Sequence, residues 1–388
     1  MLVHRFEPPR QKTGSKSKTT PPNITVVTRV RPISSEEGSW GLVVAVCSRS
    51  DSIGAVDLHK LRRVVGGVPP LIVILLISIG ADVQTKIIYD DVVHSLIPWA
   101  WDGNVGTLFA YGQKGSGKTF TVRGLEHLVA QSLFDGTLEG ERNLYLAIFE
   151  LAGNSAYDLL SARAPFPVRE DHLGTTQLVG IQESQIGSTP ELLALLNTAN
   201  ELRRSAHTVK NDGSLRSHAV CRIRIERPSQ EPGRDGILYL IDLAGSEAAR
   251  DVFSHLTERM KETRELNMSL SVLKDYIRSM PGIDKGDGTA PSKAYIPFRQ
   301  STLTKVLKHL FDSSESRQCR TTVIACINPS FLDTGASKNT LRYAEMLCQS
   351  QPAPKWEVHY PSAHTMHDLS YRVANKEKQV PVLGLLRS

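Results

Sequence analysis

The segment from Gly112 to Thr119 limits what this 388-residue chain can fold into more than any other feature. It reads GQKGSGKT, which satisfies the pattern G-x-x-x-x-G-K-[S/T], and it follows the apolar run TLFAY. A glycine-rich turn between a strand and a helix directs backbone N–H groups around a β-phosphate, Lys118 then reaches the β- and γ-oxygens, and the Thr119 hydroxyl ligates Mg²⁺. Because strand and helix patterns flank the match, a chance glycine-rich turn is disfavoured, and a phosphate-binding loop is predicted. Its residues are Gly112, Gln113, Lys114, Gly115, Ser116, Gly117, Lys118 and Thr119.

A second run points to the same chemistry. Residues 238–242 read LYLID, an apolar strand that ends in Asp242, and this arrangement holds an Mg²⁺-bound water in phosphate-loop enzymes. The residues LAGSE follow, and Gly245 is free to pivot and offer its N–H to a γ-phosphate. Alone, the run is an ordinary strand-to-turn transition. Beside the phosphate-binding loop, it predicts that Thr119 and Asp242 form the metal side of one site.

Apolar runs alternate with helical periodicities along most of the chain, which predicts an α/β protein. Strands are expected at residues 23–32, 106–111, 143–151, 219–226, 237–241 and 321–327. Helices are expected at residues 83–100, 190–204, 257–280, 301–311 and 338–348. The predicted fold class is a P-loop NTPase with a central, mostly parallel sheet flanked by helices on both faces.

The chain divides into one expected domain and two tails. Residues 1–22 are rich in Lys, Ser, Thr and Pro, have little to bury and predict a disordered basic tail. Residues 23–348 predict the domain, and residues 349–388 a poorly ordered tail. Residues 40–80 diverge from the α/β pattern: LIVILLISI at 71–79 favours one buried strand, but no turn signals place it. True divergence and a misread gene boundary both remain explanations for this stretch.

Several motifs together resemble the kinesin motor domain. AYGQKGSGKT is similar to the family's AYGQTGSGKT, NDGSLRSH at 211–218 to its switch I signature NxxSSRSH, and LIDLAGSE to its switch II signature LVDLAGSE. The resemblance continues through TRELNMSLSVLKDYI, YIPFRQSTLTKVL and NTLRYAEM, and spans residues 24–346. It implies a kinesin motor fold, ATP and Mg²⁺ as cofactors, and ATP hydrolysis coupled to microtubules. It also implies that Arg29 and Pro32 line the adenine, with Phe120 as a flat stacking surface.

The resemblance assigns the hydrolytic step to six residues: Ser214, Arg216, Ser217, Asp242, Gly245 and Glu247. The two serines would lie near the γ-phosphate. Arg216 and Glu247 would form a gating ion pair that closes the site and helps to position the attacking water. Asp242 would hold Mg²⁺ through water, and Gly245 would sense the γ-phosphate. Charge stabilisation and water placement then carry phosphoryl transfer without a covalent intermediate.

One residue departs from the family pattern. Leu215 stands where the family has the second serine of SSRSH, a hydroxyl that helps to coordinate Mg²⁺ in the closed state. Water can replace one ligand, since Mg²⁺ readily retains waters, but the closed state is expected to be weakened. Two functions therefore stay open: a microtubule-stimulated ATPase, nearest in the wording of SLSVLKDYIRSM and STLTKVLKHLF to the internal-motor depolymerising branch, and a hydrolysis-impaired, nucleotide-binding microtubule adaptor. The absence of a coiled-coil heptad run agrees with the adaptor.

Cations at two places are expected to contact the acidic surface of tubulin. Lys274 and Arg278 lie four residues apart on the expected helix 257–280, away from its apolar stripe, where a solvated face is the alternative. Arg299, Lys305 and Lys308 lie in a segment without an acid. The resemblance favours partner binding, because the family docks both segments on tubulin.

The net charge of +6 and the pI near 9.0 hint at an acidic partner. Residues 1–20 hold five cations and one acid, a balance of +4, which leaves +2 for the rest. A basic nucleic-acid-binding surface is therefore disfavoured, and a P-loop NTPase acting on nucleic acid rests on pI alone. The apolar run 68–79 contains two prolines and is shorter than the ~20 residues of a bilayer span, so no membrane span is expected. The five cysteines form no CxxC pair, so a reduced, intracellular set of thiols is expected. With the resemblance, the expected location is the cytoplasm, on microtubules. The acids Glu170 and Asp171 read as part of a solvated loop.

Overall fold

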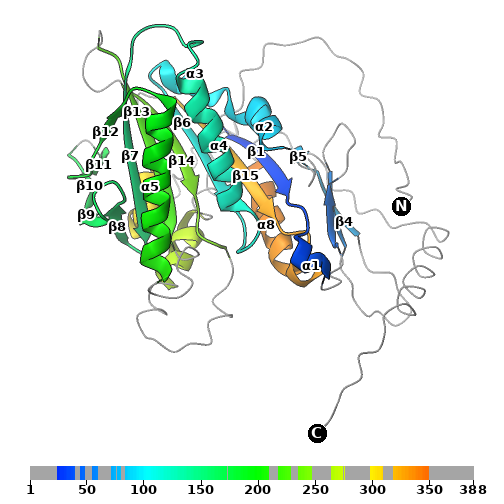
Figure 1. The fold of residues 1–388 in the computed structure, drawn as a ribbon. Helices are drawn as coiled ribbons and strands as arrows, with labels where there is room; N and C mark the ends of the chain where they lie inside the picture. Colours follow the sequence, from blue (N-terminus) through cyan, green and yellow to red (C-terminus); the bar gives the residue numbers. More distant parts are fainter. Residues whose placement is uncertain are drawn as a thin grey trace, which may run out of the picture.

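The computed structural model shows a central sheet with helices against both faces (Figure 1). It describes residues 24–39, 44–48, 55–59, 71–75, 77–79, 84–172, 174–208, 217–228, 235–246, 264–273, 275, 298–308 and 318–348. For residues 47–48, 55, 57–59, 71–75, 77–79 and 206–208 only the backbone is described. The two expected tails, residues 1–22 and 349–388, lie outside the described residues.

Within the described residues, the central sheet contains ten strands in the order β5-β1-β15-β6-β14-β13-β7-β8-β9, with β12 paired to β7. Their bounds are β5 Ile77–Ile79, β1 Ile24–Val30, β15 Cys319–Ile327, β6 Val105–Tyr111, β14 Gly236–Asp242, β13 His218–Glu226, β7 Asn143–Ala152, β8 Ser155–Asp158, β9 Ala164–Phe166 and β12 Ser184–Ile186. The pairs from β5 to β14 are parallel, and those from β14 to β9 are antiparallel. The sheet is therefore mixed, and the expected parallel order holds in the half that carries the phosphate-binding loop.

Helices cover both faces of this sheet. One face carries α3 (Leu96–Trp101), α4 (Lys118–Leu133) and α5 (Thr189–Thr208), and Figure 1 shows α4 and α5 side by side. The other face packs against residues 264–273, α7 (Thr302–Val306) and α8 (Thr334–Cys348). Alternate residues of β6 enter opposite cores, with Leu108 and Ala110 in one and Phe109 and Tyr111 in the other. This strand is buried on both faces, as expected for a strand that feeds a phosphate-binding loop.

The divergent stretch forms strands in two different sheets. β2 (Val46–Ser48), β3 (Ala55–His59) and β4 (Leu71–Leu75) make a small antiparallel sheet. β5 leaves that sheet and pairs in parallel with β1 at the edge of the central one. The expectation of a single strand over 71–79 is therefore wrong, because the apolar run divides between two sheets and composition alone carries no signal for that break.

The expected helix 83–100 is also divided. It begins as α2 (Thr85–Ile88), passes through a π-helical turn (Tyr89–Val93) and resumes as α3. The other expected strands occur where they were predicted, as do helices 190–204 and 338–348. The expected helix 301–311 is shorter, because α7 ends at Val306 and residues 309–311 lie outside the described residues, and helix 257–280 is described at residues 264–273 and 275. Among the described residues, no helix combines the length and the apolar character needed to cross a membrane.

Candidate nucleotide-binding site

The loop between β6 and α4 has the backbone geometry that its sequence predicts. A Cβ atom on Gly112 would lie 2.2 Å from the carbonyl oxygen of Cys326 on β15, so only glycine fits there. Gly117 caps the N-terminus of α4 with φ +92°, which is left-handed and favours glycine. The two glycines let the loop turn tightly from the buried strand into the helix, whose N-terminus attracts anions.

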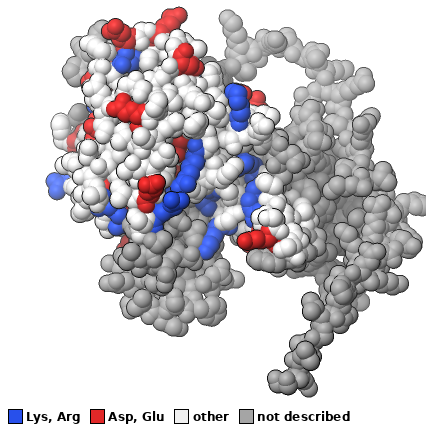
Figure 2. Space-filling model, viewed as in Figure 1, with Lys and Arg blue, Asp and Glu red and all other residues white. Residues whose placement is uncertain are grey.

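Lys118 is the first residue of α4 and is buried. Its Nζ donates to the carbonyl oxygen of Gln113 at 2.7 Å, and the Ser116 hydroxyl donates to the same carbonyl at 2.8 Å. The lysine charge is thus held inside the loop that it is predicted to serve. Figure 2 shows Lys and Arg side chains gathered along the middle of this face, over the region between α5 and α1 (Ser35–Ser39) where the loop lies.

Thr119 and Asp242, the two residues predicted to serve a metal, face each other. The Thr119 hydroxyl donates to Asp242 Oδ2 at 2.8 Å. Asp242 is buried at the end of β14, and its Oδ1 is a buried oxygen with no hydrogen-bond partner in the part of the chain that the structure describes. A hydroxyl beside an unsatisfied carboxylate oxygen is the donor chemistry that Mg²⁺ prefers. The residues present therefore fit the ion.

Arg203 of α5 completes this cluster and was not predicted. Its Nη1 donates to Asp242 Oδ2 at 3.1 Å, and its Nη2 donates to the carbonyl oxygen of Ser217 at 2.8 Å. The two paired side chains are only 6% and 7% exposed. The guanidinium thus joins α5, the start of β13 and the end of β14. The sequence carries no local signal for this contact, since 39 residues separate the arginine from the aspartate.

The segment after Asp242 is tied to the phosphate-binding loop and to the opposite face of the sheet. Ser246 N donates to the carbonyl oxygen of Gly112 at 3.0 Å, which holds the half-buried Gly245 beside the loop. Ala244 N donates to Nδ1 of the buried His218 at 3.1 Å, and the other ring nitrogen lies 3.1 Å from the Ser269 hydroxyl. Burial, helped by nearby Arg203 and Lys118, lowers the pKa of His218 to about 3. The ring is therefore neutral, with Nδ1 accepting and Nε2 donating.

Two of the three residues expected to line a base, Arg29 and Phe120, lie together beside the loop. Arg29 is buried, its Nη1 donates to the Thr121 hydroxyl at 2.5 Å, and its guanidinium carbon lies 5.2 Å from the centre of the Phe120 ring. Burial lowers the pKa of Arg29. The Phe120 side chain is 68% exposed, unusual for so large an apolar group, and is open to a flat ligand.

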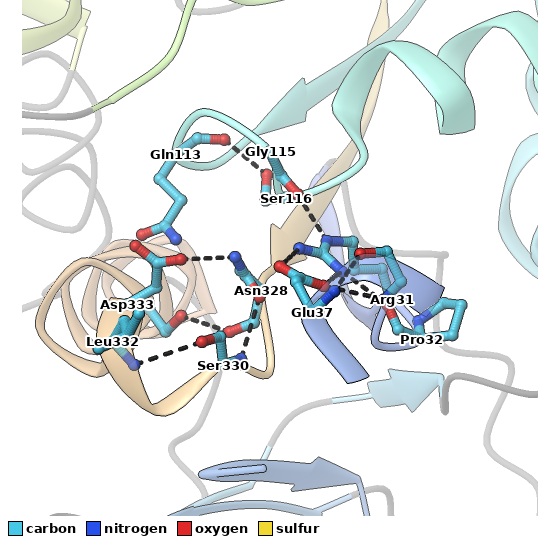
Figure 3. Close-up of polar contacts among 12 residues, drawn as sticks. Arg31, Pro32, Glu37, Gln113, Gly115, Ser116, Asn328, Ser330, Leu332 and Asp333 are labelled. Atoms are coloured by element: carbon cyan, nitrogen blue, oxygen red, sulfur yellow. Dashed lines mark hydrogen bonds and ion pairs between the residues drawn. The ribbon is translucent and has the colours of Figure 1, made fainter. Parts of the chain in front are cut away.

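Arg31, which was not predicted as a site residue, contacts the same loop. Its Nε donates to the carbonyl oxygen of Gly115 at 2.5 Å, and its Nη1 donates to that of Pro32 at 2.7 Å (Figure 3). It alternates with Arg29 on the RVRP run, so its selection was within reach of the sequence. Its ion pair with Glu37 could not be predicted, because Glu37 lies in the following helix α1.

The expected gating pair, Arg216 and Glu247, lies outside the described residues, as do Ser214 and Leu215. Lys274 and Arg278 also lie outside them. Ser217 is described and fully buried, and its carbonyl holds Arg203.

The segment that carries Arg299, Lys305 and Lys308 contains no acid in its sequence, but the fold brings one against it. Arg299 Nε and Lys308 Nζ donate to the two oxygens of Glu170, at 2.8 and 2.7 Å. Glu170 ends β10 (Val168–Glu170), which pairs with β11 (Thr176–Leu178), and its side chain is 22% exposed. Lys308 is 11% exposed and also donates to the carbonyl oxygen of Gly174, whereas Lys305 is half-buried. The interpretation of Glu170 as part of a solvated loop was wrong, because the folded hairpin brings it against α7.

A phosphate-binding loop at the end of a parallel strand, with a carboxylate at the end of the neighbouring strand, defines a P-loop nucleotide-binding protein. The comparisons narrow that class. A family model described as the kinesin motor domain matches residues 77–349, more than half of the chain. The chain therefore belongs to the kinesin motor domain family, and the expected fold is confirmed.

Curated relatives and a solved structure agree with this assignment. The chain is 31% identical over 331 residues to kinesin-like protein KIN-13B of Arabidopsis thaliana, covering 83% of this chain and 46% of the relative. It is 31% identical to diatom spindle kinesin-1 of Cylindrotheca fusiformis, covering 87% and 53%, and 34% identical to kinesin-like protein KIF24 of Mus musculus, covering 69% and 19%. The C-terminal motor and motor homology domain of Kar3Vik1, fused to a synthetic coiled coil, matches with a TM-score of 0.69 at 24% identity, covering 84% of this chain and 85% of that one. The chain thus spans about half the length, or less, of these curated relatives.

Proposed function

We propose that this chain binds ATP with Mg²⁺ and hydrolyses it in a cycle coupled to microtubule binding. The observation that carries the proposal is the arrangement of three residues: Lys118 is held inside the phosphate-binding loop, and the adjacent Thr119 is hydrogen-bonded to the buried Asp242. Membership of the kinesin motor domain family supports it. The remaining described residues are assigned by what they contact, and those outside the described residues by the motifs shared with the family.

Lys118 exchanges its contact with the Gln113 carbonyl for the β- and γ-phosphate oxygens. Thr119 and Asp242 would hold Mg²⁺, which neutralises phosphate charge when bound. Arg203 orients the Asp242 carboxylate through their buried ion pair. Gly245, held next to the loop by the Ser246–Gly112 hydrogen bond, offers its N–H toward the γ-phosphate.

The base is proposed to lie on Phe120, with Arg29 and Pro32 at its edge. The exposed ring supplies the flat surface, and the Thr121 hydroxyl fixes the buried Arg29 beside it. Gly112, Gln113, Lys114, Gly115, Ser116 and Gly117 complete the cradle for the phosphates.

Ser214, Arg216, Ser217 and Glu247 are proposed to close the site and position water. Leu215 weakens this closure by removing a hydroxyl ligand of Mg²⁺, so slow hydrolysis is expected. A hydrolysis-impaired microtubule adaptor is the second candidate, and Leu215 is the observation that favours it.

Microtubules are the proposed partner, and the cytoskeleton of the cytoplasm the proposed location. His218 links the Ala244 backbone beside the nucleotide site to Ser269 on the helix at 264–273, which gives a physical route between the site and the partner-facing helix. The proposed contacts are Lys274, Arg278, Arg299, Lys305 and Lys308, with Lys308 acting from a nearly buried position. Similarity to KIN-13B and KIF24 favours the internal-motor depolymerising branch.

Co-sedimentation with microtubules in ATP and in a nonhydrolysable analogue, alongside ATPase assays, tests these functions. The proposal expects nucleotide-dependent binding and stimulated hydrolysis, both lost in Lys118→Ala, and faster hydrolysis in Leu215→Ser. Binding that ignores nucleotide state would support the adaptor and overturn the motor. Absence of microtubule binding would overturn both, and binding to nucleic acid in a separate assay would then favour a P-loop NTPase acting on nucleic acid.

A further inference from the structure

The short helix α1 begins with a reciprocal cap. The Ser34 hydroxyl accepts from Glu37 N at 3.2 Å, and Glu37 Oε2 accepts from Ser34 N at 2.9 Å. This is a capping box, the S-x-x-E pattern in which each residue satisfies the other's free N–H group. A helix of this length has little stability of its own, so the cap and its tertiary contacts hold it in place.

Glu37 also forms an ion pair with Arg31. Glu37 Oε1 and Oε2 accept from Arg31 Nη2 and Nη1, at 2.5 and 2.7 Å, in a two-pronged ion pair. The paired side chains are 16% and 15% exposed. The Arg31 hydrogen bonds, together with those of Ser34, lower the pKa of Glu37 to about 2, so the carboxylate is charged at every working pH.

Arg31 in turn reaches the tip of the phosphate-binding loop. Its Nε donates to the Gly115 carbonyl, and its Nη1 is shared between Glu37 and the Pro32 carbonyl (Figure 3). Gly115 has φ +73°, and a Cβ placed on it would meet nothing within 4 Å, so side-chain packing does not hold the tip. The Arg31 side chain also passes 3.7 Å from the Cβ position of Gly117. The Glu37 carboxylate and the Pro32 carbonyl orient the guanidinium, and its Nε holds the loop through the Gly115 carbonyl.

We propose that the capping box of α1 positions Arg31 as a brace that fixes the tip of the phosphate-binding loop before nucleotide arrives. Glu37 is then a positioning residue for nucleotide affinity. The inference rests on the proposed nucleotide binding. A loop that samples its binding-competent shape for a smaller fraction of the time binds more weakly by that same fraction. Once nucleotide is bound its own contacts order the loop, so the catalytic step is spared.

The test is equilibrium binding of a fluorescent ADP, with Mg²⁺, to the 388-residue chain and its variants. Glu37→Ala is expected to raise Kd about tenfold, the effect of a tenfold smaller competent fraction. Glu37→Gln retains one acceptor oxygen, which can serve the cap and one N–H of the guanidinium, but its NH2 group cannot accept the second and the charge is lost, so it is expected to recover only part of that loss. Glu36→Ala, an exposed acid on the same helix, removes the same charge and is expected to leave Kd unchanged. In ATPase assays the Glu37→Ala effect should fall on KM rather than on kcat.

Each outcome decides a separate point. Failure of the unsubstituted chain to bind the nucleotide would overturn the proposed function itself. Unchanged affinity in Glu37→Ala, with the unsubstituted chain binding, would overturn only the brace. An equal loss in Glu36→Ala would reduce the effect to surface charge, and a loss of affinity matched by a collapsed thermal transition would reduce it to folding. If Glu37→Ala fails to fold, Arg31→Lys is the second variant, because it keeps the charge, loses the planar fork and is expected to weaken binding to a similar degree.

Discussion

Two groups of ion-paired side chains lie in different surroundings in this molecule. Arg203 and Asp242 meet at the nucleotide site with side chains 6% and 7% exposed. Arg299 and Lys308 meet Glu170 between α7 and the β10–β11 hairpin, where the side chains of Arg299, Glu170 and Lys308 are 65%, 22% and 11% exposed. The hydrogen-bond lengths are similar, at 3.1 Å in the first and 2.7–2.8 Å in the second. Distance therefore does not separate the clusters, and burial does.

Burial changes what each ion pair contributes. Removing one partner of a buried pair leaves the other charge without water, at a cost of about 3–5 kcal/mol, whereas exposed pairs contribute about 0–1 kcal/mol. Arg203 is thus expected to hold three elements at the nucleotide site in one geometry. The Glu170 cluster, in which Arg299 is exposed but Lys308 is nearly buried, is expected to tune the charge offered to an acidic partner and to contribute less to folding than the Arg203–Asp242 pair.

The largest expected effect comes from breaking the buried pair. Arg203→Met keeps the apolar stem, leaves Asp242 uncompensated and is expected to lower the free energy of unfolding by about 3–5 kcal/mol. Denaturant unfolding measures it, with Arg204→Met as the control, because that neighbouring arginine is exposed. Equal losses in the two variants would show that the burial of Arg203 is not what matters. The nucleotide affinity of the folded fraction should also become less sensitive to Mg²⁺.

The pH dependence of stability sharpens the buried side of the comparison. The pKa of His218 is lowered to about 3, so below pH 6.5 the unfolded chain takes up a proton that the folded chain refuses. The contribution of this group is complete above pH 6.5 and is lost as the pH falls toward 3, by roughly 2 kcal/mol at pH 5. His218→Asn, which cannot take up that proton, is expected to show a flatter profile between pH 6.5 and 5. Burial and the charge of Asp242 raise the pKa of Glu126 to about 8. Protonation of this group makes stability rise as the pH falls below 8, and it does so in the unsubstituted chain and in His218→Asn alike.

The two ion-paired groups also differ in how far they could be predicted from the sequence. Local patterns were sufficient for the strand–loop–helix unit and for the pairing of Thr119 with Asp242, because the carboxyl ends of neighbouring parallel strands meet at one edge. They were insufficient for Arg203, since nothing along α5 marks which of its side chains points at β14. They failed for Glu170 because Lys308, its partner, lies 138 residues away. The break between β4 and β5 was missed because an uninterrupted apolar run does not tell which sheet takes each part.

A smaller effect is expected at the Glu170 cluster, which is only partly exposed. Glu170→Gln removes the negative charge that Arg299 and Lys308 share, and the gain in net positive charge is expected to tighten microtubule binding about threefold. Because Arg299 is 65% exposed but Lys308 only 11%, the free energy of unfolding is expected to fall by about 1–3 kcal/mol, less than in Arg203→Met. Co-sedimentation at low salt measures the first, with Glu141→Gln, an exposed acid in another part of the fold, as the charge-matched control. Weaker binding in Glu170→Gln would mean that the glutamate positions the cations for the partner and does not mask them.

The smallest effect is expected at the i,i+4 pair Lys86–Asp90, whose side chains are 62% and 51% exposed at 3.0 Å. Both residues stay in water, and the cation precedes the acid, the less favourable order on a helix. Asp90→Ala is therefore expected to change the free energy of unfolding by about 0.3 kcal/mol, and 1 M NaCl should remove even that difference. This pair has nearly the same length as Arg203–Asp242, so measuring both by the same denaturant titration isolates burial as the variable. A loss in Asp90→Ala as large as that in Arg203→Met would break the comparison, because ion-pair length and not burial would then set the energy.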